Sequence, residues 1–242
     1  MGKSLSELRD FALGKKGDGE TVYGYYFLRR VSPLATWVFL RLGVSANFVT
    51  LTALLIALSG SFMFSSTSIY FWIGGWILYQ FYYILDCSDG EVAVITNTTS
   101  EFGAFLDKIS HPITNSAIIF MSAFGAYRIT GSLPLLIFSA SGAIMFNLTS
   151  VMRYFAQNKS SETNRSKNSS NKKRSENVAL KGFRIAKNLA TRPGGITHPL
   201  LGLLLVDLMF GTTYRIFYPA LASFMGIILV LKRFNNLRRT MK

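Results

Sequence analysis

Three aspartates and one histidine are spaced so that helices would bring them together. Asp86 and Asp89 stand three residues apart, and Asp107 and His111 stand four residues apart. On an α-helix, side chains at these offsets lie on one face. The four residues adjoin long apolar segments, and ionisable groups at the ends of membrane helices are costly to bury and usually functional. We therefore expect two helical stripes that face each other across one polar site.

Carboxylates in this arrangement suit a hard divalent cation. Mg²⁺ and Mn²⁺ prefer oxygen ligands and usually complete their coordination with water and substrate phosphate. We predict that all three aspartates bind such a cation. Gly90 and Ala93 share the first stripe, and Gly103 begins the second. Small residues also serve ordinary helix packing in membranes, but beside three aspartates we predict that they let a nucleotide or phosphate approach the backbone.

The complete pattern is D-x-x-D-G-x-x-A-V, eight further residues, and G-x-x-x-D-x-x-x-H. It resembles the signature of the CDP-alcohol phosphotransferase family, which has Arg in place of Val94 and a last Asp in place of His111. Residues Val44–Thr50 are similar to the family's P-N-x-V-T segment, with Ala46 in place of Pro. The resemblance implies a membrane enzyme that transfers a substituted phosphate from a CDP-linked donor to a hydroxyl acceptor and releases CMP, in phospholipid biosynthesis.

The resemblance also implies roles for individual residues. Asp86, Asp89 and Asp107 match the metal-binding aspartates of the family, and Asn47 and Thr50 would lie beside the CDP moiety. Together with Gly90, Ala93 and Gly103, these two residues form the predicted nucleotide-binding set. The last aspartate of the family motif is thought to take the proton of the acceptor hydroxyl.

His111 occupies that last position, and three interpretations stay open. An imidazole is a suitable general base at neutral pH, and this is the role that we predict. It could instead bind the metal, which would favour a mixed or softer metal site, or the activity could be lost. Val94 removes a positive charge from the site. Arg153, near the inner end of the fourth predicted span, is our candidate for contacting phosphate or the acceptor.

Four functions are compatible with this sequence. We favour CDP-diacylglycerol as the donor, because a compact chain without a separate soluble module suits a lipid donor. The first alternative is transfer of a phospho-alcohol from a soluble CDP-alcohol to a lipid or glycan acceptor. The second is an inactive homologue that binds nucleotide or lipid. The third is an ion-coupled transporter, but its acidic residues would be expected near the membrane midplane.

Composition places the chain among membrane proteins. It has 242 residues, 50% of them hydrophobic, and a mean hydropathy of +0.30, which suits a polytopic membrane domain. The net charge of +14 comes from a few hydrophilic segments, so we expect contact with anionic membrane lipids and no nucleic acid. A single cysteine, Cys87, excludes a disulfide framework. The composition is also compatible with a homodimer.

We predict an all-α integral membrane protein in two parts. Residues 1–30 form a cytosolic lead-in with an interfacial amphipathic helix, begun by a capping box of Ser4 and Glu7. Residues 31–242 form a catalytic domain of six transmembrane helices with a basic cytosolic loop at 156–198. The predicted spans are 45–64, 70–92, 103–127, 133–153, 199–212 and 214–231.

Positive charge predicts the orientation of these spans. Lysine and arginine number seven in residues 1–44, eleven in 153–198 and five in 232–242. Cytoplasmic segments carry such an excess, so we expect a multi-pass protein of the cytoplasmic (inner) membrane. Both termini and the active site would face the cytosol. Asp207 would lie near the outer end of the fifth span, where we expect a hydrated anion.

Overall fold

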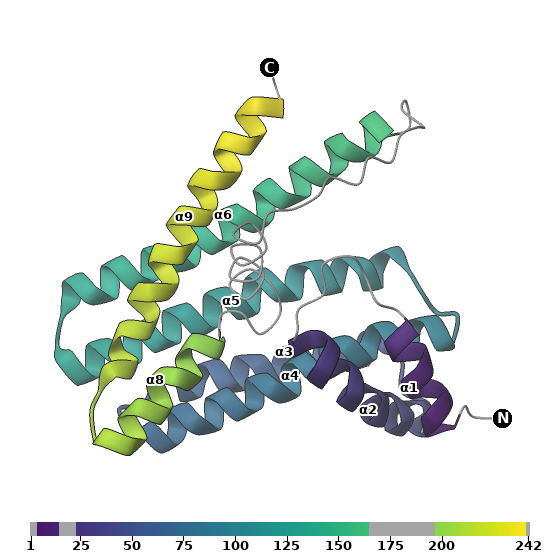
Figure 1. The fold of residues 1–242 in the computed structure, drawn as a ribbon, viewed down its shortest axis with the longest axis horizontal. Helices are drawn as coiled ribbons and strands as arrows, with labels where there is room; N and C mark the ends of the chain where they lie inside the picture. Colours follow the sequence, from purple (N-terminus) through teal and green to yellow (C-terminus); the bar gives the residue numbers. More distant parts are fainter. Residues whose placement is uncertain (1–3, 15–22, 165–196, 241–242) are drawn as a thin grey trace, which may run out of the picture.

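The computed structural model describes residues 4–14, 23–164 and 197–240, and in these ranges the chain is helical with no β-strand. The all-α class is therefore confirmed. Figure 1 shows long helices that run side by side, with α2 packed against α4 and α1 against α2. The α-helices are α1 (Leu5–Gly14), α2 (Arg29–Leu42), α3 (Ala46–Met63), α4 (Ile69–Ile95), α5 (Glu101–Thr130), α6 (Leu133–Asn164), α8 (Thr197–Phe210) and α9 (Tyr218–Thr240).

Serine side chains cap the first turns of α3 and α5. Ser45 caps α3 by accepting a hydrogen bond from the amide of Phe48, and Ser100 caps α5 by accepting one from the amide of Gly103. Such caps satisfy amides that have no partner within the helix. At the N-terminus, Ser4 and Glu7 form the predicted capping box, with N···O distances of 2.8 and 3.3 Å.

The described helices overlap all six predicted spans, but α9 continues to Thr240, nine residues past the predicted end of the sixth span. Two further differences concern α6 and α2. Helix α6 continues to Asn164, so the first part of the expected loop at 156–198 is helical; residues 165–196 lie outside the described ranges. The second difference is α2, a 14-residue helix that we did not predict. The expected boundary at residue 30 falls in its first turn, and the placement of α1 or α2 at a membrane surface stays a prediction.

Helix α2 is fastened to the motif helix by a buried carboxylate. Glu91 on α4 is 2% exposed and accepts hydrogen bonds from Ser32 at 2.7 Å and Thr36 at 2.6 Å. The Ser88 hydroxyl also donates to the carbonyl of Ser32 at 3.1 Å. A buried carboxylate is tolerated when its oxygens are hydrogen-bonded. Glu91 therefore holds α2 on the side of α4 that faces away from the motif aspartates.

Three turns meet at the end of the bundle opposite the motif. Arg128 donates to the carbonyl of Ser65 at 3.2 Å, and Arg215 donates to the carbonyl of Thr67 at 2.9 Å. Arg215 also pairs with Asp207 at 3.0 Å, and the Asp207 carboxylate accepts two backbone amides. The expectation of a hydrated Asp207 is therefore wrong. The residue is 2% exposed, because Arg215, eight positions later, folds back to neutralise it.

Two of the described helical segments are both long and apolar enough to cross a membrane, Ala46–Met63 and Tyr214–Lys232. Helices α4 and α5 are longer, with 27 and 30 residues, and exceed the ~20 residues that a bilayer needs. They contain the polar motif and many hydroxyl-bearing side chains, which lower their mean hydropathy. The count of six spans stays a prediction.

Candidate active site

A pocket of about 330 Å³ opens where α3, α4 and α5 meet. Its walls include all eight residues predicted for the metal and the nucleotide, and the turn between α4 and α5 closes one side. Asp86 lies 17 residues beyond the start of α4, or roughly 25 Å along the helix. The pocket is therefore at the far end of the bundle from the three joined turns. The predicted residues that line it are Asn47, Thr50, Asp86, Asp89, Gly90, Ala93, Gly103 and Asp107.

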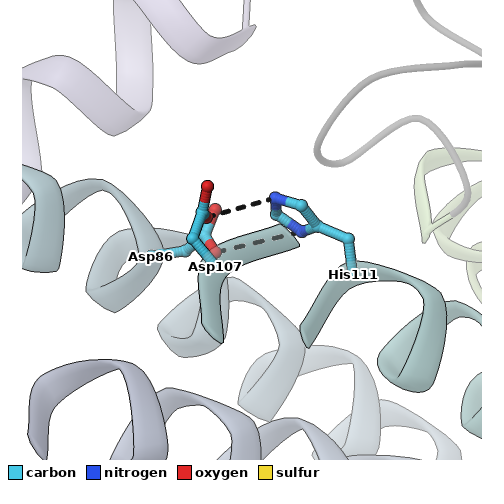
Figure 2. Close-up of side chains that lie close together, drawn as sticks. All are labelled: Asp86, Asp107 and His111. Atoms are coloured by element: carbon cyan, nitrogen blue, oxygen red, sulfur yellow. Dashed lines mark ion pairs between the residues drawn. The ribbon is translucent and has the colours of Figure 1, made fainter. Parts of the chain in front are cut away.

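Asp86 and Asp107, which line this pocket, converge with the imidazole of His111, which stands beside the pocket and is not one of its lining residues. Figure 2 shows the ring of His111, from α5, facing the side chains of Asp86 and Asp107. His111 Nε2 lies 3.6 Å from Asp107 Oδ1, and Nδ1 lies 3.9 Å from Asp86 Oδ1. One ligand atom from each residue lies within 4.8 Å of the others. The side chain of Asp86 is only 11% exposed, whereas that of Asp107 is 51% exposed.

Asp89 lies in the same pocket but is held differently. Its Oδ2 accepts a hydrogen bond of 2.6 Å from the hydroxyl of Thr50 on α3, and its Oδ1 accepts one from the amide of Gly90. The residue is 6% exposed. Asp89 is not part of the group of three within 4.8 Å. Thr50 thus links α3 to the motif and orients one of the predicted metal ligands.

The two pocket glycines differ in their surroundings. A Cβ atom on Gly90 would meet nothing within 4 Å, so the backbone is open to the pocket there. A Cβ atom on Gly103 would lie 3.0 Å from Asn47 Oδ1 and 3.2 Å from Ser100 Oγ. The space beside Gly103 is therefore filled by the start of α3 and by the helix cap. Gly90 fits the predicted approach of a ligand to the backbone, and Gly103 chiefly lets α5 pack against Asn47.

One departure from the family motif removes a positive charge from the pocket wall. Val94 lines the wall with an apolar side chain where the family has Arg. Arg153 lies on α6, but its side chain is outside the described part of the chain. The structure therefore does not test its predicted contact with phosphate.

Sequence reasoning missed one residue beside His111. The Tyr82 hydroxyl lies 2.9 Å from His111 Nδ1, and Tyr82 is 2% exposed. A signal was available, because Tyr82 precedes Asp86 by four residues and so shares its face of the helix. It was overlooked because tyrosine is common in membrane helices and carries no charge.

The donor atoms present fit a divalent cation. Two carboxylate oxygens within 4.8 Å of each other repel unless a cation or a proton lies between them. Mg²⁺ and Mn²⁺ take carboxylate oxygens, whereas imidazole nitrogen is a more usual ligand of softer cations such as Zn²⁺. Asp86 and Asp107 would hold Mg²⁺ or Mn²⁺, with His111 beside them and Asp89 elsewhere in the same pocket.

The fold and the pocket define a helical bundle with a carboxylate site at one end. The model of the CDP-alcohol phosphatidyltransferase family matches residues 43–192, which include the whole motif and more than half of the chain. The chain belongs to this family, whose members are transferases that depend on divalent metal. The resemblance seen in the motif is therefore confirmed.

Comparison with individual proteins points to the same family. A stretch of 93 residues is 32% identical to phosphatidylinositol phosphate synthase of Streptomyces avermitilis; it covers 38% of this chain and 37% of that relative. The fold is similar to that of phosphatidylinositol phosphate synthase of Mycobacterium tuberculosis, whose crystal structure has CDP-DAG bound. That similarity has a TM-score of 0.57 at 17% identity and covers 85% of this chain and 92% of the solved chain.

Proposed function

We propose that this protein is a membrane phosphatidyltransferase that takes CDP-diacylglycerol as its donor. The observation that carries the proposal is the convergence of Asp86, Asp107 and His111 within 4.8 Å in a chain of this family. The donor is supported by the solved relative, which has CDP-DAG bound. A hydroxyl group of the acceptor would attack the phosphorus of the phosphatidyl group. CMP would leave as the bond between phosphorus and the CMP oxygen breaks.

The aspartates of the pocket would hold Mg²⁺ or Mn²⁺. When bound, the cation neutralises the donor's pyrophosphate oxygens and stabilises the charge that develops on CMP. Asp86 and Asp107 are the residues best placed to hold it, because one oxygen of each lies within 4.8 Å of the other. Asp89 would present its remaining lone pairs to the cation in a fixed direction, because the Thr50 hydroxyl holds its carboxylate.

The other pocket residues would receive the CDP moiety. Asn47 and Thr50 stand on α3 opposite Gly90 and Ala93 on α4. The open backbone at Gly90 leaves room for a flat cytosine ring or a phosphate. Gly103 would contribute indirectly, through its close packing on Asn47.

We propose His111 as the general base of the transfer. The acceptor oxygen must lose its proton as it bonds to phosphorus, and Nε2 of His111 lies 3.6 Å from Asp107 Oδ1, beside the pocket. The proton would move from the acceptor oxygen to Nε2. General-base assistance of this kind typically contributes about 10²–10⁴-fold in rate.

The test of this function is CMP release by the purified protein in detergent or vesicles. With Mg²⁺ or Mn²⁺, we expect CMP from CDP-diacylglycerol and a polar alcohol or alcohol phosphate, and no CMP when a chelator is present. Turnover of a soluble CDP-alcohol with a lipid or glycan acceptor would identify the alternative transferase. Ion flux in sealed vesicles without any CMP would instead indicate a transporter.

We also propose that the pocket faces the cytosol. Of the 26 lysines and arginines, the three joined turns contain or adjoin only Arg128 and Arg215, whereas residues 1–44, 153–198 and 232–242 carry 23. Single cysteines at exposed Thr67 and Thr98 test this, as Thr67→Cys and Thr98→Cys in a Cys87→Ala background. In intact cells, an impermeant reagent should label Thr67→Cys and leave Thr98→Cys unlabelled. The reverse pattern would refute the orientation.

A further inference from the structure

One ring nitrogen of His111 is held by a buried tyrosine. The Tyr82 hydroxyl lies 2.9 Å from His111 Nδ1. The carboxylate oxygens of Asp86 and Asp107 lie 3.9 Å and 3.6 Å from the two ring nitrogens. Of these three distances, only the first is a hydrogen-bond length. The direction of the imidazole therefore depends on Tyr82 more than on the aspartates.

The hydroxyl of Tyr82 has a fixed position. Tyr82 is 2% exposed and packs against the rings of Tyr79 and Tyr83, with centroids 5.9 Å and 5.1 Å away. Thr114, three residues after His111 on α5, places its hydroxyl 3.4 Å from that of Tyr82 and donates to the His111 carbonyl at 3.1 Å. Close packing of this kind leaves a side chain few alternative rotamers.

A neutral imidazole carries one hydrogen, so the partner of one nitrogen sets the role of the other. If Nδ1–H donates to the oxygen of Tyr82, the Tyr82 hydrogen must turn to the Thr114 hydroxyl, and Nε2 keeps its lone pair facing Asp107. If Tyr82 donates to Nδ1, Nε2 carries the hydrogen and is unable to accept a proton. A general base at His111 requires the first arrangement.

We propose that Tyr82 is a positioning residue that keeps His111 in the Nδ1–H tautomer. This inference rests on the proposed function for its catalytic consequence, whereas the tautomer is a property of the protein alone. In the transfer step, the O–H bond of the acceptor breaks as Nε2–H forms, and the new O–P bond replaces the bond to CMP. Nδ1–H stays hydrogen-bonded to the Tyr82 oxygen throughout, so the same hydrogen bond holds the imidazolium that forms.

The tautomer can be measured directly by NMR. The chain has two histidines, so ¹⁵N-histidine labelling with a His198→Gln variant isolates the ring of His111. In spectra at about pH 8, where an unperturbed imidazole is neutral, with Mg²⁺ present, we expect the hydrogen on Nδ1. We expect Tyr82→Phe to yield a mixture of tautomers. A hydrogen on Nε2 in the wild type, or an unchanged Tyr82→Phe spectrum, would overturn the inference.

The kinetic consequence separates positioning from stability. Losing an orienting partner of an active-site histidine typically costs about 10–100-fold, and we expect that loss in kcat for Tyr82→Phe with an unchanged KM for the donor. The matched control is Tyr79→Phe, because Tyr79 is 1% exposed and its hydroxyl binds Ser61 and the Thr114 carbonyl. It should keep its kcat. Equal losses in the two variants would overturn the inference.

The two proposals fail in different ways. If the wild type releases no CMP from any donor, the proposed function fails, and the wild-type NMR spectrum still decides whether Tyr82 sets the tautomer. If CMP is released and the ring carries its hydrogen on Nε2, the function stands and the positioning role of Tyr82 is rejected. Assigning that spectrum requires His198→Gln to fold, and it does not require Tyr82→Phe to fold.

Discussion

Replacing Asp86 or Asp107 with asparagine should reduce kcat/KM for CMP release by at least about 10³-fold, because several kcal/mol of charge stabilisation depend on the bound cation. Both residues point into the same space within 4.8 Å of His111, so each change removes a donor from one site. Binding of Mn²⁺, followed by electron paramagnetic resonance, should weaken in both variants. Glu101→Gln is the matched control, because Glu101 is an exposed acid of α5 that does not line the pocket.

Thermal unfolding of the same variants should show that their loss of activity is not caused by misfolding. The side chain of Asp86 is 11% exposed, and one of its oxygens lies within 4.8 Å of an oxygen of Asp107. Asp89, by contrast, is held by a hydrogen bond of 2.6 Å from Thr50. In a chelator, replacing Asp86 with neutral asparagine relieves charge repulsion. We expect the Tm to stay the same or to rise, by about 2–4 °C for each kcal/mol gained. A large fall in the Tm of Asp86→Asn would contradict this account of the site.

Replacing His111 with alanine should lower kcat by about 10²–10⁴-fold, because the acceptor would lose its general base. The donor should still bind, since Asn47, Thr50 and Gly90 line another part of the pocket. Single-turnover kinetics and donor binding, measured separately, check this expectation. His111→Asp restores the residue of the family motif and should retain more activity than His111→Ala.

Metal binding decides between the roles of His111. If His111→Ala turns over normally, the residue is not the base. If it loses Mn²⁺ affinity as strongly as Asp107→Asn does, His111 is a metal ligand, and the proton must leave through another group. The distance of 3.6 Å between His111 Nε2 and Asp107 Oδ1 is compatible with a cation between them, so affinity and rate have to be measured together.

The motif could be interpreted from the sequence because it is local. The periodicity of a helix places Asp86, Asp89, Gly90 and Ala93 on one face whatever surrounds them. The aspartates and glycines could therefore be assigned to a common pocket before the structure was known. The helix caps at Ser4 and Ser100 depend on residues three positions away and were predictable for the same reason.

Contacts between helices could not be obtained in this way. Periodicity says which residues share a face, but the partner on the next helix depends on the crossing angle and on the register along both helices. Nothing in the sequence indicated that α2 would form and bind Glu91 through Ser32 and Thr36. The pairing of Asp207 with Arg215 was missed for the same reason, since it requires the turn between α8 and α9 to fold back.

By itself, the sequence determined the helical class, the position of most helices and the residues that line the pocket, because hydrophobic length and helical spacing are properties of short segments. The tertiary structure decided how those residues are used. It places Thr50 against Asp89 and Tyr82 against His111, although each pair is separated by 29 residues or more. Each of these hydrogen bonds forms only when two helices pack in one register, and that register is set by the core of the whole bundle.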